Sequence, residues 1–538
     1  MPARCPPTNA HMNDTPNARP AQPLRFFHRG QVVEVRDVHP TRSVLDWLRE
    51  DARCTGTKEG CNEGDCGACT VVIGELAAEG ASGAVGGLQL QTVNACIQFL
   101  PTLQGKALFT VEDLKQQCGH VHDGERHSKH PVRELHPVQQ AMVDCHGSQC
   151  GFCTPGFVMS LWATYEHHSE AGTAPTRQQL ADELSGNLCR CTGYRPILDA
   201  GQKMFDLPAV RLDTVPVVAA LQGLKREGTF DYAAPLGQRT DRFMAPVTLD
   251  AFAALREAHP QARILAGSTD VGLWVNKQFR DLGDILYVGD VAELKRIAEE
   301  GDALYIGAGA SLEEAWRAIV RRAPTLQDVW LRFASPPIRN AGTLGGNVAN
   351  GSPIGDSPPI LMALDAQIVL RKGKAVRRMP LPDFYVDYMK NRLEPGEFVQ
   401  GLSIPLSAFG RQLRGYKISK RFDCDISALC AGFAIELDGD TVRSVRLAYG
   451  GMAAIVKRAV QAEAALTGRA WTQASVDAAK AALAQDFKPL TDMRASADYR
   501  LQVAQNLLQR LWLETRSQDA LAPDATSVWS VMPHDVAA

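Results

Sequence analysis

The sequence lacks several features that would fix its class at once. It has no run approaching the ~18 apolar residues of a membrane-spanning helix. A formal net charge of −3 over 538 residues gives no basis for binding nucleic acid or an anionic membrane. Residues 1–23 lack the apolar core of a secretory signal and are rich in Pro, Asn and Ala, so we expect a disordered N-terminal extension there. At roughly 150 residues per domain, the length predicts three or four domains.

Cofactor-binding fingerprints of the commonest kinds are also missing. No stretch matches a Walker loop, and the nearest match to a Rossmann fingerprint, Gly307-x-Gly309, lacks the third glycine and the opening helix. An NAD-binding Rossmann domain is therefore not expected in this chain.

Cysteine is present but unevenly placed, with eight of the 14 cysteines in two groups. The first group, CNEGDCGACT, has the C-x4-C-x2-C spacing of plant-type ferredoxins, which needs one more distant cysteine as the fourth ligand. Cys96, in VNAC, is the natural candidate. We expect the N-terminus to be unprocessed, and the cysteines are clustered. Both features favour metal ligands in a reducing cytoplasm over disulfides.

The second cysteine group consists of two close pairs, CGFC and CRC. Thiolates that are close in sequence can converge on one iron–sulfur cluster. Helical patterns surround the pairs, and the free N–H groups at helix ends can point at cluster sulfides. The first third of the chain therefore predicts two clusters in series.

The local patterns predict the elements around these cysteines. A hairpin over 24–38, a helix beginning near Ser43 and two strands around a Gly/Ala loop indicate a β-grasp ferredoxin unit over 24–117. About four short helices are expected over 137–206, followed by a linker over 207–241 that has prolines and no strong period.

The stretch 118–136 carries five histidines and invites a metal-binding interpretation. It shows neither the i, i+4 spacing nor a carboxylate–histidine pattern, so a solvated insert is the favoured interpretation. Its histidines are His120, His122, His127, His130 and His136.

The second half alternates strand and helix patterns and predicts an α/β unit over 242–410 and a small α+β domain over 411–520. AELKRIAEE is read as one of the helices. The tracts 264–272 and 340–356 combine glycines with Ser, Thr, Asn and Asp, as loops that wrap a phosphate-bearing cofactor do. Each alone could be an ordinary turn-rich loop; two of them downstream of two cluster sites favour a redox cofactor.

Together these motifs resemble the molybdenum hydroxylases. CNEGDCGACT, SQCGFCTPG and GNLCRCTGYRPI resemble their iron–sulfur half, and LAGSTDVG and FASPPIRNAGTLGGNVANGSPIGDSPP resemble their FAD-binding region. Clusters and flavin on one chain most resemble the small iron–sulfur/FAD subunits of bacterial xanthine dehydrogenases, over residues 24–515. The N-terminal extension, the Gly/Ala loop before Cys96 and the His-rich insert depart from the family pattern.

The resemblance assigns roles to particular positions. It implies that the 2Fe-2S ligands are Cys61, Cys66, Cys69 and Cys96 for the first cluster and Cys150, Cys153, Cys189 and Cys191 for the second. Segments implied to clasp FAD contain Ile264, Leu265, Ala266, Gly267, Ser268, Thr269, Asp270, Val271, Thr343, Leu344, Gly345, Gly346 and Asn347. Phe333 and Lys417 would lie beside the flavin, and Asp356 would contact the cofactor, although their plainer interpretations are core, surface strand and turn residues. Gln149 would reach the pterin of a partner subunit.

The implied function is electron transfer. A molybdopterin-binding large subunit would oxidise hypoxanthine and xanthine to urate, and electrons would pass through the two clusters to FAD and then to NAD⁺. The implied assembly has two copies of each subunit. Another heterocycle or an aldehyde stays open as the substrate, because the substrate pocket would lie on the partner. A zinc-stapled binding protein is a weaker alternative, since C-x-C and C-x4-C-x2-C fit zinc spacings poorly.

Overall fold

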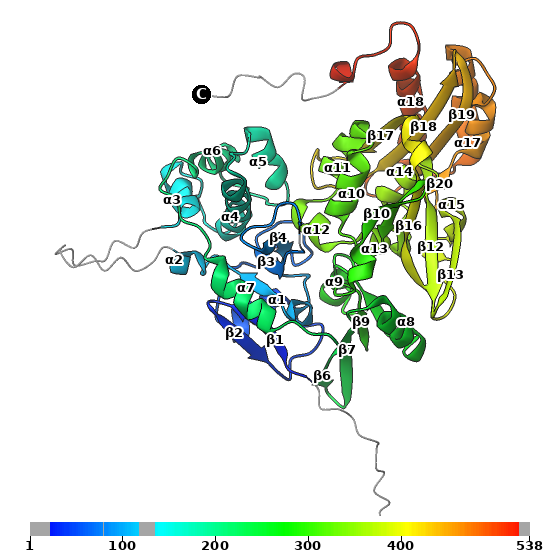
Figure 1. Cartoon of the computed structure of the whole chain (residues 1–538). Helices are drawn as coiled ribbons and strands as arrows, with labels where there is room; N and C mark the ends of the chain where they lie inside the picture. Colours follow the sequence, from blue (N-terminus) through cyan, green and yellow to red (C-terminus); the bar gives the residue numbers. More distant parts are fainter. Residues whose placement is uncertain (1–21, 79, 118–134, 527–538) are drawn as a thin grey trace, which may run out of the picture.

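The computed structural model describes residues 22–78, 80–117 and 135–526. Figure 1 shows a small sheet unit at the N-terminal end, a group of helices beside it, and two larger units that carry the second half of the chain. This multidomain α+β arrangement confirms the predicted fold class. Of the predicted N-terminal extension, 1–21 lies outside the described residues.

The ferredoxin-like unit (24–117) is a five-stranded sheet in the order β2-β1-β5-β3-β4. β1 and β5 run parallel and the other neighbours antiparallel, as in a β-grasp. Ser43 caps the predicted helix by accepting a hydrogen bond from the Asp46 amide. The elements are β1 (Leu24–His28), β2 (Gln31–Val35), α1 (Val44–Asp46), the π-helical turn η1 (Trp47–Asp51), β3 (Thr70–Leu76), β4 (Leu88–Asn94), η2 (Leu100–Leu103), β5 (Ala107–Phe109) and α2 (Leu114–Gln117).

The helical unit (135–206) contains the four predicted helices. Its long central helix is buried along most of its length and shares a core with one face of the ferredoxin-like sheet, where the Phe109 and Trp162 rings lie 5.3 Å apart. The two units therefore pack as neighbours around one apolar core. The helices are α3 (Pro137–Asp144), α4 (Thr154–Ala171), α5 (Arg177–Glu183) and α6 (Arg195–Lys203).

His136 corrects part of the predicted solvated insert. Residues 118–134 of that insert, with four of its histidines, lie outside the described residues. His136 is fully buried and caps α3: its Nδ1 accepts a hydrogen bond from the Val138 amide at 3.3 Å, and its own amide donates to Gln139. The Pro at the first helical position should have indicated a helix start at this histidine.

The predicted linker 207–241 is also corrected, because it contains regular structure. It holds α7 (Thr214–Gly223), β6 (Phe230–Leu236) and the first residues of β7 (Arg239–Ala245). Pro216 lies in the first turn of α7, where a missing N–H does no harm. Buried Val217 and Leu221 pack this helix toward the ferredoxin-like sheet, beside which it lies in Figure 1.

The central unit (230–405) has one sheet in the order β6-β7-β9-β8 and a second in the order β10-β11-β16-β12-β13. AELKRIAEE is not a helix: a short turn, η3, is followed by β10, which forms a hairpin with β11 around Gly301 at φ +61. The glycine-rich tract near 340 folds into short helices. The elements after β7 are α8 (Leu249–Ala258), β8 (Arg263–Leu265), α9 (Val271–Asn276), β9 (Ile285–Tyr287), η3 (Ala292–Lys295), β10 (Ile297–Glu300), β11 (Ala303–Gly307), α10 (Leu312–Val320), η4 (Pro324–Leu326), α11 (Gln327–Arg332), α12 (Pro336–Ala341), α13 (Leu344–Asn350), α14 (Ser357–Ala363), β12 (Gln367–Lys372), β13 (Ala375–Pro380), α15 (Leu381–Phe384), β14 (Tyr385–Asp387), β15 (Lys390–Asn391), β16 (Phe398–Pro405) and η5 (Leu406–Gly410).

The C-terminal unit (412–526) is an antiparallel sheet, β17-β18-β19-β20, packed against three helices. Long elements of both kinds, such as β19 and α18, agree with the small α+β domain expected from the sequence. The elements are β17 (Gln412–Ile418), β18 (Leu429–Asp438), β19 (Thr441–Gly450), β20 (Lys457–Arg458), α16 (Val460–Leu466), α17 (Gln473–Asp486), α18 (Ala497–Thr515) and η6 (Pro523–Thr526).

Candidate functional site

The first cysteine set, Cys61, Cys66, Cys69 and Cys96, is brought together by the loop before β3 and the turn after β4. The structure arranges it as two pairs. Cys61 and Cys66 exchange amide-to-sulfur hydrogen bonds of 3.3 Å each way, and Cys96 hydrogen-bonds to Cys69. Cys69 and Cys96 are buried, at 2% and 1% exposure.

Hydrogen bonding within the pairs separates the acidities of the thiols. The hydrogen bond from Cys66 lowers the pKa of Cys61 to about 5, while the pKa of Cys66 is raised by the same contact. The pKa of Cys96 is raised by its hydrogen bond to Cys69 and by burial. One thiolate in the first pair is thus already favoured, and thiolates are the form that metals bind.

The second set is also arranged as two pairs. Each pair joins a cysteine at the start of α4 to a cysteine in the segment before α6. The Cys191 and Cys150 sulfurs lie 3.6 Å apart, and Cys153 hydrogen-bonds to Cys189. Burial and that hydrogen bond raise the pKa of Cys153 to about 12. Cys150 and Cys191 are exposed, unlike any member of the first set.

The paired arrangement fits 2Fe-2S clusters, in which each iron takes two protein ligands. Across the described ranges no three His, Cys, Asp or Glu side chains form a group that could hold a single metal ion. The assignment of the eight cysteines as cluster ligands stays a prediction.

The two cysteine sets are in direct backbone contact. The Leu188 amide, next to Cys189, donates to the Cys66 carbonyl at 3.0 Å, and Asn187 donates to the Gly67 carbonyl at 3.1 Å. A Cβ on Gly67 would lie 2.2 Å from the Gly186 carbonyl oxygen, so this approach requires glycine. The segment carrying Cys189 is docked on the loop of the first set.

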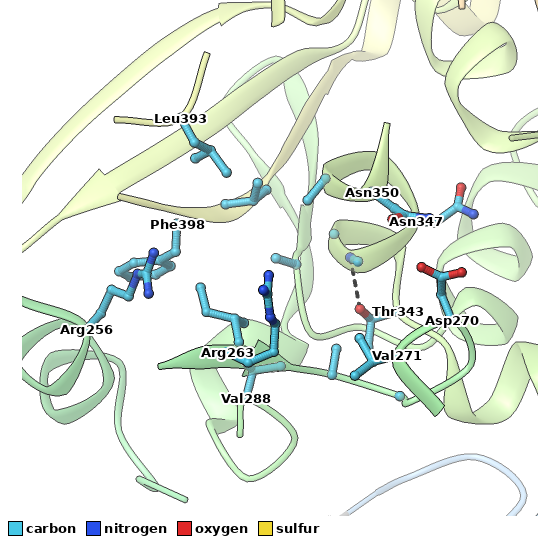
Figure 2. A pocket seen from close by; sticks show the side chains of 18 of the residues that line it. Arg256, Arg263, Asp270, Val271, Val288, Thr343, Asn347, Asn350, Leu393 and Phe398 are labelled. Atoms are coloured by element: carbon cyan, nitrogen blue, oxygen red, sulfur yellow. Dashed lines mark hydrogen bonds between the residues drawn. The ribbon is translucent and has the colours of Figure 1, made fainter. Parts of the chain in front are cut away.

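The two glycine tracts line one cavity of about 720 Å³ in the central unit, within the size range of cofactor sites (Figure 2). The loop after β8 and the start of α9 form one wall, and Thr343 with α13 forms another. Thr343 accepts a hydrogen bond from the Gly346 amide at 3.1 Å, which holds the first turn of α13 in place. The predicted FAD residues that line the cavity are Ile264, Ala266, Gly267, Ser268, Thr269, Asp270, Val271, Thr343, Gly345, Gly346 and Asn347.

This cavity fits a polar, phosphate-bearing cofactor. Two of its lining atoms, Ser268 Oγ and Asn347 Oδ1, are buried and have no hydrogen-bond partner in the protein, which is costly unless a ligand supplies one. Gly267 lies so close to the backbone of the second tract that a Cβ would lie 1.7 Å from the Ala341 carbonyl oxygen. A Cβ on Gly345 would lie 2.3 Å from the Ala308 Cβ. These glycines let the segments around the cavity pack closely together, and Ser268 and Asn347 leave polar atoms free for a ligand.

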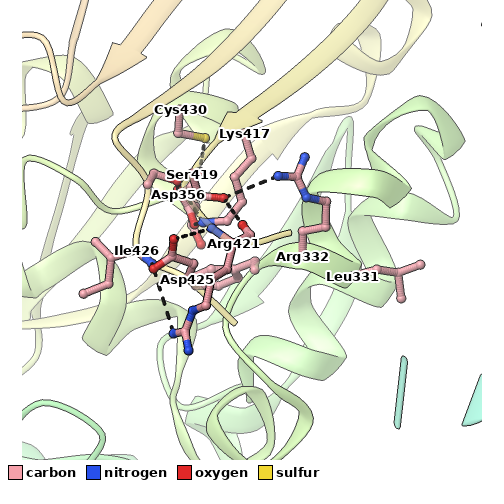
Figure 3. Close-up of polar contacts among 12 residues, drawn as sticks. Leu331, Arg332, Asp356, Lys417, Ser419, Arg421, Asp425, Ile426 and Cys430 are labelled. Carbon is pink, nitrogen blue, oxygen red and sulfur yellow. Dashed lines mark hydrogen bonds and ion pairs between the residues drawn. The ribbon is translucent and has the colours of Figure 1, made fainter. Parts of the chain in front are cut away.

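Five of the residues predicted for the flavin site do not line this cavity. Leu265 and Leu344 are core residues, and Phe333 is buried against Trp316, with ring centroids 5.9 Å apart. Asp356 and Lys417 form a buried ion pair instead (Figure 3): Lys417 Nζ lies 2.6 Å from Asp356 Oδ2.

The Asp356–Lys417 pair is closed by Ser427, whose hydroxyl donates to Asp356 at 2.6 Å and accepts from Lys417 at 2.8 Å. Lys417 is only 2% exposed, so its interpretation as a surface strand residue was wrong. Together with Ser427, the pair links the start of α14 to β17 and to the loop before β18, and so joins the central and C-terminal units.

Several lining residues were missed from the sequence. Arg263 and Trp274 flank the first tract and could have been found by extending it, and Asn350 lies within the second tract; Arg263 lies 5.2 Å from the Trp274 ring. Arg256 and Phe398 come from α8 and β16, where no local signal points to a cofactor.

Four family models match successive parts of the chain. They describe a 2Fe-2S iron–sulfur cluster binding domain at residues 26–99, a 2Fe-2S binding domain at 123–202, an FAD binding domain in molybdopterin dehydrogenase at 238–407, and a CO dehydrogenase flavoprotein C-terminal domain at 414–515.

Two curated relatives and one solved structure are similar to this chain. Xanthine dehydrogenase of Emericella nidulans is 32% identical over 92% of this chain and 39% of its own length. Aldehyde oxidase 4 of Cavia porcellus is 30% identical over 85% of this chain and 36% of its own length. A structure of carbon monoxide dehydrogenase from Hydrogenophaga pseudoflava is 28% identical, covers 50% of this chain and 94% of that chain, and has a TM-score of 0.47. The chain spans less than two fifths of the length of these two curated relatives.

The chain is a molybdenum hydroxylase family member that carries two 2Fe-2S domains, an FAD-binding domain and the C-terminal domain that follows it. These four domains are those of the family's electron-transfer module. The predicted cofactors, two 2Fe-2S clusters and FAD, are therefore confirmed at the level of domains. Within the described ranges, no helix is both long enough and apolar enough to cross a membrane.

Proposed function

We propose that this chain is the electron-transfer subunit of a xanthine dehydrogenase. It would take electrons from a molybdopterin-binding partner subunit that oxidises hypoxanthine and xanthine to urate, and deliver them to NAD⁺. When bound, the clusters carry single electrons, and FAD accepts electrons singly and gives them up in pairs. The 32% identity to the xanthine dehydrogenase of Emericella nidulans supports this proposal, and the 30% identity to aldehyde oxidase 4 keeps an aldehyde as the second candidate substrate.

The observation that carries the proposal is the order in which the three sites touch. The second cysteine set contacts the first through Leu188 and Cys66, at 3.0 Å. The first set contacts the flavin side through Asn276, at the end of α9, whose amide donates to the Cys96 carbonyl at 2.8 Å. The other end of α9 lines the cavity. This continuous contact supports electron flow from the second set, through the first, to the cavity.

The exposed face of the second set supports a partner subunit there. Cys150 and Cys191 are exposed, and the aromatic side chains of Phe152 and Tyr194 beside them are 48% and 40% exposed. Gln149 is exposed on the same loop, as a residue reaching toward a partner's pterin must be. We propose a complex with the molybdopterin subunit at this face, with two copies of each chain.

The residues of the cavity would hold FAD by its polar backbone contacts and by Ser268 and Asn347. The chain has no Rossmann fingerprint, so we propose that NAD⁺ docks transiently over the bound flavin. Tight binding of NAD⁺ to flavin-free protein would contradict this step.

An anaerobic absorbance titration of the cofactor-loaded single chain tests the proposal. We expect NADH to bleach the flavin and cluster bands, and xanthine to bleach neither until the molybdopterin subunit is added. If NADH bleaches neither band, the NAD-linked function is wrong. If the complete complex is reduced by aldehydes or other heterocycles but not by xanthine, the chain serves a related hydroxylase.

A further inference from the structure

Asn276 joins the cavity side of the molecule to both parts of the first cysteine set. Its side-chain amide donates to the Cys96 carbonyl at 2.8 Å and to Asn62 Oδ1 at 3.1 Å. Asn62 follows Cys61 directly, so one half-buried amide spans the segments that carry one member of each cysteine pair. Asn276 comes from the central unit, whereas both acceptors belong to the ferredoxin-like unit.

The helix that carries Asn276 is also part of the cavity wall. α9 runs from Val271, which lines the cavity, to Asn276, a length of about 9 Å at 1.5 Å per residue. Gly272 packs against Ile97, the neighbour of Cys96, so closely that a Cβ would lie 2.9 Å from the Ile97 carbonyl oxygen. A short rigid element therefore separates the cavity from the first set, and Asn276 fixes its far end.

We propose that Asn276 is a positioning residue that holds the first cluster's loop against the flavin helix and raises the reduction potential of that cluster. Reduction adds negative charge, and a hydrogen-bond donor beside the ligand segments stabilises the reduced form. The inference rests on the proposed function only in taking the first cysteine set as the cluster's ligands.

The test uses Asn276→Asp and Asn276→Ala in the cofactor-loaded chain. Asp removes the donor and adds negative charge, whereas Ala removes the donor alone. The control is Asn340→Ala: the Asn340 amide also crosses to the ferredoxin-like unit, donating to the Thr92 carbonyl at 3.1 Å and hydroxyl at 3.2 Å, but it touches neither Cys96 nor Asn62.

Midpoint potentials are measured by mediated titration followed by electron paramagnetic resonance, with the two cluster signals assigned by a Cys150→Ser variant. We expect Asn276→Asp to lower the potential of the first cluster so that its one-electron equilibrium with the flavin shifts about tenfold, or about 59 mV. Asn276→Ala should shift it less in the same direction. The potential of the second cluster should be unchanged in both Asn276 variants. Both cluster potentials should be unchanged in the Asn340→Ala variant. Internal electron transfer after mixing with NADH should slow in both Asn276 variants.

Unchanged potentials in both Asn276 variants would overturn the inference, and so would an equal shift in Asn340→Ala, which would indicate general loosening of the interface. If Asn276→Asp fails to assemble the cluster, Asn276→Ala decides alone. The mediated titration needs neither NADH nor xanthine, so a wrong acceptor or substrate leaves this result standing.

Discussion

The two cysteine sets have the same number of cysteines but different surroundings. Three other units of the same chain form hydrogen bonds with the first set, through Leu188, Asn276 and Arg421. The Arg421 guanidinium donates to Asp65, in the loop of that set, at 3.1 Å. The second set has two exposed members, Cys150 and Cys191. Because solvent exposure and hydrogen bonds set cluster potentials, this chain alone fixes the environment of the first set, whereas a partner would complete that of the second.

The comparison is broken most directly by removing one ligand from each set. Cys150→Ser should abolish the second cluster and lower xanthine-to-NAD⁺ electron flow in the complex by roughly 100-fold or more, beyond the loss typical of removing an outer partner of a metal ligand. FAD content and flavin reduction by NADH should persist, because the exposed second set lies away from the cavity. Resonance spectra, flavin content and turnover measure these three outcomes.

Cys96→Ser is the matched change in the buried set, and it should also lower the unfolding temperature, since Cys96 is 1% exposed within a shared core. Cys145→Ser, a cysteine of the helical unit outside both sets, serves as the control and should behave as the unmodified protein. Loss of flavin from Cys150→Ser would show that flavin binding in the central unit depends on the cluster of the helical unit.

Asp356→Ala tests whether flavin binding can be weakened without loss of the clusters at either cysteine set. The change leaves Lys417 buried without its carboxylate, which costs about 3–5 kcal/mol for a buried pair. We expect flavin occupancy to fall while both cluster signals remain, as measured by absorbance and resonance on one sample. Adding Lys417→Met should restore much of the lost stability. Full flavin content with unchanged stability would remove Asp356 from the cofactor-supporting residues.

The parts of this molecule that local sequence determines were predictable. The hairpin around Arg29-Gly30, the helix capped by Ser43 and the four helices of the second set follow from turn residues, capping residues and apolar periods close in sequence. The cysteine spacings carry their chemistry in the same local way, but the pairs that the structure forms in the second set join the two segments, as Cys191 with Cys150 does, and the ligand assignment stays a prediction.

The errors have the opposite origin. IAEE has a helix-compatible composition but forms β10 because β11 offers a hairpin partner. Phe398 and Arg256 line the cavity only because distant strands and helices converge there. The sequence around Lys417 indicates an exposed side chain, because its buried partner, Asp356, lies 61 residues away in the sequence. Pairing and burial across units cannot be inferred from a period of two or 3.6 residues in one segment.

Iron removal sharpens the comparison between the two sets. With an iron chelator under mild reduction, the second cluster should be lost roughly ten times faster than the first, because its exposed sulfurs are accessible to solvent. Resonance signals followed over time give both rates in one sample. Adding the molybdopterin subunit should slow loss of the second cluster only. Equal rates without the partner would mean that the exposure of Cys150 and Cys191 does not control access.

The smallest expected effect concerns His136, which caps α3 in the unit that carries the second set. Burial lowers the pKa of His136 to about 4, below its ordinary value of 6.5. The unfolded chain therefore binds a proton at higher pH than the folded chain does, so stability falls as pH drops from about 6.5 toward 4, by on the order of 3 kcal/mol in full. His136→Asn keeps a side-chain acceptor for the Val138 amide and cannot titrate. Unfolding temperatures of both proteins between pH 7 and pH 5 should diverge, with the variant losing less, while the first set, which this histidine does not contact, keeps its cluster signal; parallel curves would show that His136 is not a source of the acid sensitivity.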